Sequence, residues 1–453
     1  MATAAKKHDL TQGPLWSQIL IFSVPLVFSN LLQVLFNLPD IAVVGQFVGA
    51  MALGAVGSTS ILVSMFTGFL IGLSGGINVL TARYFGARNK ESLGRTIHSA
   101  VIVSLLLGLA LTAIGLTFSK TVLALLGTKD ELMDGAVLYF RIYMFGMPAL
   151  ALYNFGNAVF SAVGNTKKPL FYLTVSGILN VVLNLFFVIV CDLAVAGVTL
   201  ASIISQYLSA FLVLAALFRS REDYSLHWNR MCLDKKQAAE VLSIGLPSGL
   251  QSCIFALANL FIQAGVNSFD AIMVSGNSAA ANADAIVYNV MASFYTACGS
   301  FMGQNYGARK KDRIQKSYFI SLLYSFAVGT GLGLLLVAFG EGFLGLFTSE
   351  PEVIAAGMKR LTIMGLSYGI SAFMDNTIAA CRALGKTLIP SIIVMLGSCV
   401  FRILWVKTIF AYFQTIPSLY LLYSVSWTLT GIAEIVYFAK VYRKTVKAIV
   451  TPT

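Results

Sequence analysis

Charged side chains are scarce in this 453-residue sequence, since only 11% of its residues are Asp, Glu, Lys or Arg. Soluble domains carry roughly a quarter of such residues. Hydrophobic residues make up 57% of the chain, and the mean hydropathy is +0.81. A chain this poor in charge cannot cover a globular surface with groups that water solvates. This excludes a soluble fold and indicates an integral membrane protein.

The sequence also lacks the patterns that hold metals and disulfides. Its six cysteines show no C-x-x-C spacing and mostly lie in apolar segments, so we expect no zinc site, no disulfide framework and no cofactor. The first sixteen residues lack the apolar region and cleavage site of a signal peptide, and we expect no segment to be removed. The formal charge is +12, but the basic residues form no single patch that would predict a nucleic-acid partner.

Long apolar runs are abundant, and many reach the roughly 20 residues that a helix needs to cross about 30 Å of hydrocarbon. Charged, Gly and Pro residues separate these runs. They predict an all-α polytopic membrane protein with twelve transmembrane helices. The predicted helices lie near residues 16–44, 53–82, 96–118, 132–163, 169–190, 196–218, 238–265, 279–303, 315–339, 353–383, 388–411 and 417–441.

Lys and Arg concentrate in the N-terminus, in every second loop and in the C-terminus, whereas the intervening loops hold few basic residues. Because basic residues accumulate in short cytoplasmic loops, we expect both termini on the cytoplasmic side of the inner (plasma) membrane. This orientation requires an even number of spans, which twelve satisfies.

An internal repeat is visible, because three segments of the first half recur in the second half at one constant spacing. Y-F-G-A-R at 84–88 recurs as N-Y-G-A-R at 305–309, L-A-L-L-G-T at 123–128 as L-G-L-F-T-S at 344–349, and G-N-T-K-K-P at 164–169 as G-K-T-L-I-P at 385–390. Six predicted helices separate the equivalents, so the two halves have the same orientation, as in parallel-repeat transporters. We predict two six-helix lobes, 1–218 and 237–453, joined by a cytoplasmic linker at 219–236, with a solute site between the lobes.

Polar side chains occur inside several predicted spans of the first half, where they are costly and usually face a cavity or the bundle interior. These residues are Asn30, Gln33, Asn37 and Asp40 on one face of the first helix, Asn180 and Asn184 on the fifth, and Thr199 on the sixth. They supply one carboxylate and several neutral oxygens. Such a set suits Na⁺, held at Asp40 and Asn180, or a carboxyl group that gains and loses a proton. Amides that only join helices are the alternative.

The second half has its own acid, Asp375, on the tenth predicted helix, where Asn154 is the equivalent residue of the first half. Each half thus carries a deep acid, but on non-equivalent helices. This asymmetry suits a protein in which one half handles a coupling ion and the other binds cationic cargo. The residues predicted to contact cargo are Gln33, Asn37, Tyr153, Asn154, Gln251 and Asp375.

The predicted spans also contain prolines and two residues of opposite charge. Pro25 and Pro39 each remove a backbone hydrogen bond from the first helix, so we expect that helix to bend and to act as a bistable element. Arg402 and Glu434 lie in the last two predicted helices, and we interpret them as a structural ion pair.

Five motifs follow one another along nearly the whole chain. They are P-L-V-F-S-N-L-L-Q at 25–33 with Asp40 behind it, Y-F-G-A-R-N at 84–89, L-Y-F-R-I-Y-M-F-G-M-P-A-L-A-L-Y-N at 138–154, V-A-G-V-T-L-A-S-I-I-S-Q at 195–206 and G-Q-N-Y-G-A-R at 303–309. In this order they resemble the multidrug and toxic compound extrusion (MATE) transporters. The resemblance implies a secondary active antiporter, not an enzyme, that exports organic cations or drugs in exchange for H⁺ or Na⁺ by alternating access.

The resemblance also implies an ion site at Asp40, Asn180, Asn184 and Thr199, although many relatives carry an acid where Asn184 stands. The expected partners are small organic cations and membrane lipid, with no nucleic acid, and the protein is expected to be a monomer. A flippase for lipid-linked oligosaccharides is the alternative of related architecture. An intramembrane hydrolase with Ser74 as nucleophile is a further alternative, but all three histidines fall at or outside the membrane edges.

Overall fold

The computed structural model describes residues 9–450, except for the side chains of residues 34–39, 41, 42, 50 and 446–450. Within this range the chain forms helices joined by loops, of which the longest connects α7 to α8, and no strand occurs. The α-helices are α1 (Leu15–Val43), α2 (Ala50–Gly86), α3 (Lys90–Leu125), α4 (Asp130–Met144), α5 (Met147–Ala162), α6 (Lys167–Leu185), α7 (Ala194–Arg219), α8 (Lys235–Val266), α9 (Ala271–Gly307), α10 (Lys311–Leu344), α11 (Pro351–Gly365), α12 (Tyr368–Ala383), α13 (Leu388–Val394), α14 (Phe401–Trp405), α15 (Ala411–Phe413) and α16 (Ile416–Val450). Short π-helical or 3₁₀ segments are η2 (Val44–Val48), η3 (Phe186–Val190), η4 (Trp228–Arg230), η5 (Met395–Val400) and η6 (Val406–Phe410).

These elements agree with the predicted all-α membrane fold. In the described part of the chain, nine helical runs are long and apolar enough to cross a membrane, and the pair α4 and α5, which bends by 45°, makes a tenth. The remaining two predicted spans correspond to α9 and to the pair α11 and α12. Each of the twelve predicted helices therefore matches one helix or one interrupted helical run.

The structure also reproduces the internal repeat. Helix α2 begins at Ala50 and ends at Gly86, and α9 begins at Ala271 and ends at Gly307, so both ends are displaced by the spacing of the repeated motifs. The loop residues that follow them, Arg88 and Arg309, both have positive φ angles, of 55° and 56°. Gly164 and Gly385 form a second pair at this spacing, with φ of 88° and 79°. The repeat therefore extends to positive-φ backbone conformations, which residues other than glycine rarely adopt.

The described chain divides into two compact units. The first contains residues 31–249, and the second contains residues 9–30 together with residues 250–450. Helices α1 and α8 each continue from one unit into the other. The lobes predicted from the sequence, 1–218 and 237–453, have different boundaries, because the first half of α1 packs in the second unit through contacts such as Phe22 with Phe301, whose ring centroids lie 5.5 Å apart.

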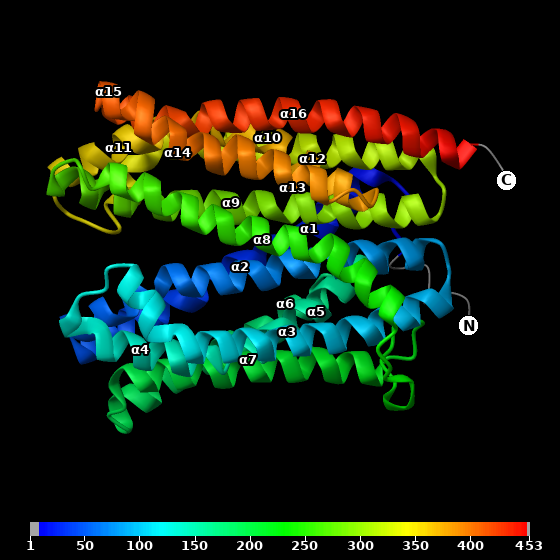
Figure 1. Ribbon diagram of the computed structural model, residues 1–453, viewed down its shortest axis with the longest axis horizontal. Helices are drawn as coiled ribbons and strands as arrows, with labels where there is room; N and C mark the ends of the chain where they lie inside the picture. Colours follow the sequence, from blue (N-terminus) through cyan, green and yellow to red (C-terminus); the bar gives the residue numbers. More distant parts are fainter. Residues whose placement is uncertain (1–8, 451–453) are drawn as a thin grey trace. The chain divides into compact units, whose positions relative to one another are not determined.

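In the first unit, α5 packs against α2, α3 and α7, and α6 packs along α7 (Figure 1). Fully buried aromatic side chains of α5, namely Tyr153, Phe155 and Phe160, fill the centre of this unit. The unit also contains a close crossing of α2 with the first half of α8. A Cβ atom added to Gly76 of α2 would lie 2.7 Å from the nitrogen of Gly245 of α8, so only glycine allows the two backbones to approach this closely.

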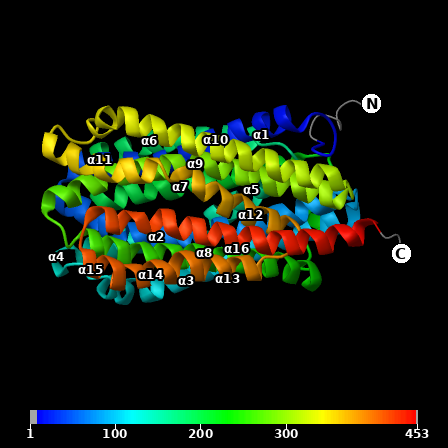
Figure 2. The ribbon, with the colours of Figure 1, turned by 90° about the horizontal axis from the view of Figure 1, so that it is seen from above.

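In the second unit, α10 lies beside α9 and α12, and α12 lies beside α16, an arrangement that Figures 1 and 2 show from two directions. A buried polar network joins these helices near one end. Arg360 of α11 donates hydrogen bonds to Asn277 and Asp284 of α9, Tyr368 of α12 donates to Asp284, and Tyr420 of α16 donates to Asn277. Four helices are thus connected through this network around one guanidinium group.

The glycine crossing gives a stability prediction with a matched control in the neighbouring residue. Gly76→Ala is expected to lower the stability of the folded protein by about 1–3 kcal/mol, because the added methyl group forces the helices apart. Gly75→Ala should be neutral or slightly stabilising, since a Cβ at Gly75 has no neighbour within 4 Å. Thermal unfolding in detergent micelles measures both effects. Equal melting temperatures for the two variants would contradict the close crossing.

Candidate functional site

Asp40, near the end of α1, is 2% exposed, and both of its carboxylate oxygens accept hydrogen bonds. Asn184 Nδ2 of α6 and Ser202 Oγ of α7 each donate to it over 2.7 Å. Asn180 accepts from Asn184 Nδ2 over 3.3 Å and donates to Ser202 Oγ over 3.1 Å. The structure therefore joins Asp40, Asn180 and Asn184, three of the four residues predicted for the ion site, in one buried cluster of the first unit.

Helix geometry explains this cluster. Asn180 and Asn184 lie one turn apart, so both side chains leave the same face of α6. That face packs against α7, which carries Ser202. Asn184 Oδ1 is buried and has no hydrogen-bond partner among the described residues. A carboxylate beside a free amide oxygen offers hard oxygen ligands to Na⁺, and the same amide oxygen can accept a hydrogen bond from a protonated carboxyl group.

Among the described residues, no basic side chain forms an ion pair with Asp40. The ion pairs in the described part of the chain join Lys90, Arg95 and Arg360 to other acids. The side chains described as donating hydrogen bonds to Asp40 are both neutral, and the phenol groups of Tyr139 and Tyr143 lie within electrostatic range. Burial of an unpaired charge costs several kcal/mol. A proton or a small cation bound at this carboxylate would remove that penalty.

Two neighbouring hydroxyl groups of α7 differ in what they contact. Thr199, predicted for the ion site, is buried but donates its hydroxyl hydrogen bond to the Val195 carbonyl over 2.7 Å. Ser202, which was not predicted, contacts Asp40 directly. The sequence could have predicted this contact, because Ser202 follows Thr199 by one helical turn and therefore lies on the same helix face.

A second group of charged residues lies in the second unit. Asp375 of α12 is half-buried and interacts electrostatically with Arg382, two turns further along the same helix, and with Arg402 of α14. Arg382 Nη2 donates a hydrogen bond to Gln251 Oε1 of α8 over 3.0 Å. The structure thus brings Gln251 and Asp375, both predicted to contact cargo, to one basic residue that was not among the predicted site residues. The two-turn spacing between Asp375 and Arg382 could have placed both on one helix face.

Arg402 is held in an aromatic environment. It is 2% exposed, its Nε donates to Ser426 Oγ over 3.1 Å, and its guanidinium carbon lies 4.6 Å from the ring centroid of Tyr423. Such cation–π contacts contribute about 2 kcal/mol when they are desolvated. Glu434 is fully buried, and neither carboxylate oxygen has a hydrogen-bond partner in the described chain. The predicted ion pair between Arg402 and Glu434 is absent from the ion pairs of the described residues.

The other residues predicted to contact cargo lie in the first unit. Tyr153 is buried and its hydroxyl lies near Gln33. Asn154 is buried, and its Nδ2 donates to the Leu150 carbonyl of its own helix over 2.9 Å. The side chain of Asn37 lies outside the described residues.

Comparison with known proteins identifies the family of this chain. The family model MatE matches residues 25–186 and 247–413, which together make up more than half of the chain. The chain belongs to the MatE family. The starts of the two matched segments, Pro25 and Pro247, are separated by nearly the spacing of the internal repeat. MatE proteins are polytopic membrane transporters and not enzymes, which agrees with the fold and with the predicted absence of an enzymatic activity.

Relatives of this MatE protein match it over most of its length. It is 28% identical to the probable multidrug resistance protein YpnP of Bacillus subtilis over 392 residues, which cover 86% of this chain and 87% of YpnP. It is 23% identical to an FAD transporter of Shewanella oneidensis over 434 residues, covering 94% and 95%. Among solved structures, a MOP superfamily transporter from Pyrococcus furiosus has a TM-score of 0.89 at 21% identity, covering 99% of both chains. A multidrug resistance MATE transporter solved in an outward-facing conformation has a TM-score of 0.89 at 20% identity, covering 98% of both chains.

Proposed function

We propose that this MatE protein is a secondary active antiporter, which exports small organic compounds in exchange for H⁺ or Na⁺ by alternating access. The observation that carries the proposal is the buried carboxylate of Asp40, which accepts hydrogen bonds from neutral donors and has no basic partner among the described ion pairs. Exchange requires only that the ion and the cargo favour opposite states of one conformational equilibrium. The multidrug resistance proteins among its relatives support export of small organic cargo.

The ion exerts its effect through α1 in this proposal. Asp40 lies in the part of α1 that belongs to the first unit, while the start of the same helix belongs to the second unit. Neutralisation of Asp40 weakens the hydrogen bonds that it accepts from Asn184 and Ser202, which belong to α6 and α7. The contacts between α1 and these helices therefore depend on whether the ion is bound, and α1 transmits the difference along its length.

Replacement of Asp40 by asparagine tests the coupling role. Asp40→Asn keeps the size of the side chain but cannot exchange an ion, so gradient-driven efflux from proteoliposomes should fall at least tenfold while cargo binding stays within about twofold. Ser202→Ala removes a hydrogen bond to a charged group and should change the ion concentration for half-maximal efflux by about tenfold. Ser205→Ala is the matched control, because Ser205 donates only to a carbonyl of its own helix.

H⁺ and Na⁺ gradients are imposed separately in this assay, so that the coupling ion is identified by the gradient that drives efflux. Wild-type rates of uphill efflux by Asp40→Asn would contradict the assignment and direct the search to Asp375. A loss of cargo binding as large as the loss of efflux would instead indicate a structural role of Asp40.

For the cargo, we propose small organic cations that interact with Asp375, with Tyr288 and Tyr295 of α9 within electrostatic range of this carboxylate. A second candidate is cargo with an anionic group. Arg382 and Arg402 both lie within electrostatic range of Asp375, and two guanidinium groups in a low-dielectric interior attract anions strongly. The relation to an FAD transporter is consistent with this candidate, because FAD carries a diphosphate.

The two candidates differ in which variant weakens which cargo. With cationic cargo, Asp375→Asn should weaken binding of a fluorescent cation about tenfold and leave a neutral analogue within twofold. With anionic cargo, Arg402→Gln should weaken binding of an anionic analogue, and Asp375→Asn should strengthen it. Asp130→Asn, on the exposed first turn of α4, is a charge-matched control. Equal effects of Asp375→Asn on cation, anion and neutral compound would indicate a packing role.

We also propose that the transporter lies in the plasma membrane as a monomer with both termini in the cytoplasm. The distribution of Lys and Arg supports this orientation. Two naturally exposed cysteines test it, since Cys191 lies in a loop proposed to be external and Cys232 in a loop proposed to be cytoplasmic. In variants that keep one of the two cysteines, a membrane-impermeant maleimide should label Cys191 on intact cells and Cys232 only after permeabilisation. The reverse pattern would invert the topology.

A further inference from the structure

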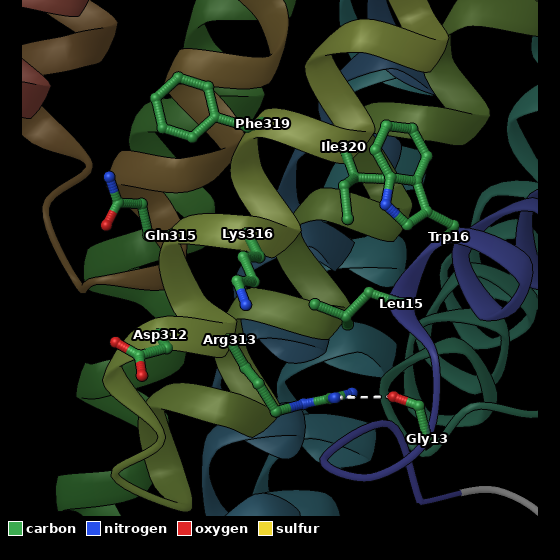
Figure 3. A pocket seen from close by; sticks show the side chains of 9 residues that line it. All are labelled: Gly13, Leu15, Trp16, Asp312, Arg313, Gln315, Lys316, Phe319 and Ile320. Atoms are coloured by element: carbon green, nitrogen blue, oxygen red, sulfur yellow. Dashed lines mark hydrogen bonds between the residues drawn. The ribbon is translucent and has the colours of Figure 1, made fainter.

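A pocket of about 730 Å³ lies where the N-terminal segment meets the first turns of α10 (Figure 3). Its lining residues are Gly13, Leu15, Trp16, Asp312, Arg313, Gln315, Lys316, Phe319 and Ile320, all within the second unit. Helices α1 and α10 begin beside it, at Leu15 and Lys311, and both are apolar enough to cross a membrane. The pocket therefore lies at the level where the membrane meets water. The transport function proposed above does not use this pocket.

Arg313 forms a rigid basic wall of this pocket. Its Nη1 donates to the Gly13 carbonyl over 2.7 Å, its Nη2 donates to the carbonyls of Leu10 and Gln12 over 3.1 and 3.2 Å, and its Nε donates to Asn305 Oδ1 over 3.1 Å. These bonds use four of the five guanidinium N–H groups, and all four acceptors are neutral. The side chain is thus held in place while its charge and one N–H group remain available.

Lys316 adds a second positive charge one turn further along α10. Its side chain is exposed and has no hydrogen bond or ion pair within the described part of the chain. Figure 3 shows it on the same side of α10 as Arg313. Residues 309–316 contain five basic residues and one acid, Asp312, so the surroundings of the pocket are strongly positive. Asp9 lies within electrostatic range of Arg313 and offsets part of its charge, but it does not line the pocket.

The polarity of the pocket changes along α10. Arg313 and Lys316 lie toward the start of the helix, and Phe319 and Ile320 lie toward the membrane interior, about 10 Å from Arg313 at 1.5 Å per residue. Trp16 faces the same space from α1. Trp16 is 52% exposed and Phe319 is 55% exposed, so two large rings are uncovered beside two cations. This order of charge followed by apolar surface complements a molecule with an anionic head and a hydrocarbon tail.

We propose that this pocket binds an anionic phospholipid. The phosphate group contacts Arg313 and Lys316, and the first part of an acyl chain lies along Trp16, Phe319 and Ile320. Basic pockets beside transmembrane helices commonly bind such headgroups. A lipid with a net negative charge is preferred to a zwitterionic lipid, because the two cations exceed the single acid of the lining. The bound lipid connects the N-terminal segment to α10 in addition to the hydrogen bonds of Arg313.

Fluorescence quenching by brominated lipids tests the proposal on the full-length protein in detergent. The emission of Trp16 is obtained as the difference between the wild-type protein and Trp16→Phe. Brominated phosphatidylglycerol should quench Trp16 at a lower mole fraction than brominated phosphatidylcholine does. We expect a difference of about fivefold for each cation that contacts the phosphate group. Lys316→Gln should reduce this preference about fivefold, and Lys316→Arg should retain it.

Lys311→Gln is the matched control, because Lys311 is exposed on the same helix but does not line the pocket. An equal loss of preference in Lys311→Gln and Lys316→Gln would show diffuse surface attraction and overturn the proposal. The absence of any preference for phosphatidylglycerol would overturn it as well. Displacement of the lipid by millimolar glycerol phosphate or inorganic phosphate would assign the pocket to a soluble phosphate compound instead.

Discussion

The structure depends on one constraint, which is that hydrocarbon offers no hydrogen bonds. Every backbone and side-chain polar group inside a span must find its partner within the protein, so the chain forms helices and gathers its buried polar side chains into clusters. Asp40 accepts from two neighbouring helices, and Arg360 joins its helix to α9 through Asn277 and Asp284. Residues that escape this rule, such as Glu434 with its two carboxylate oxygens unbonded in the described chain, are therefore exceptions that call for a functional explanation.

The twelve helices and the repeat could be predicted because both depend on local, periodic properties of the chain. A run of apolar residues predicts a membrane-spanning helix. The constant spacing between recurring motifs predicts that the second half repeats the fold of the first. The partners of individual polar side chains depend instead on how helices rotate against one another. Asn180 and Asn184 were predictable from their shared face, and Ser202 could have been found in the same way. The predicted ion pair of Arg402 and Glu434 was wrong, because opposite charges on two neighbouring helices do not determine the direction in which either side chain points.

The two halves use the same backbone to hold different chemistry. In the first, an acid on the opening helix is surrounded by amides and a hydroxyl group, and it takes part in none of the ion pairs of the described residues. In the second, the acid lies on α12, and two guanidinium groups and a glutamine share its surroundings. Positions related by the repeat, such as Asn154 and Asp375, therefore differ in charge although their helices correspond. Duplication accounts for the shared scaffold, and the buried residues that differ give each half its own polar cluster.

The division of α1 and α8 between the two units has a mechanical consequence. The described chain passes from one unit to the other only twice, near Asn30 and near Gly249, and both passages lie inside continuous helices. The long polar linker at 219–236 lies within the first unit and does not connect the two. Any displacement of one unit against the other must be absorbed as bending or twisting of two helical rods. The resistance to such a displacement at these two passages is then that of a few helical turns, and not that of a flexible loop.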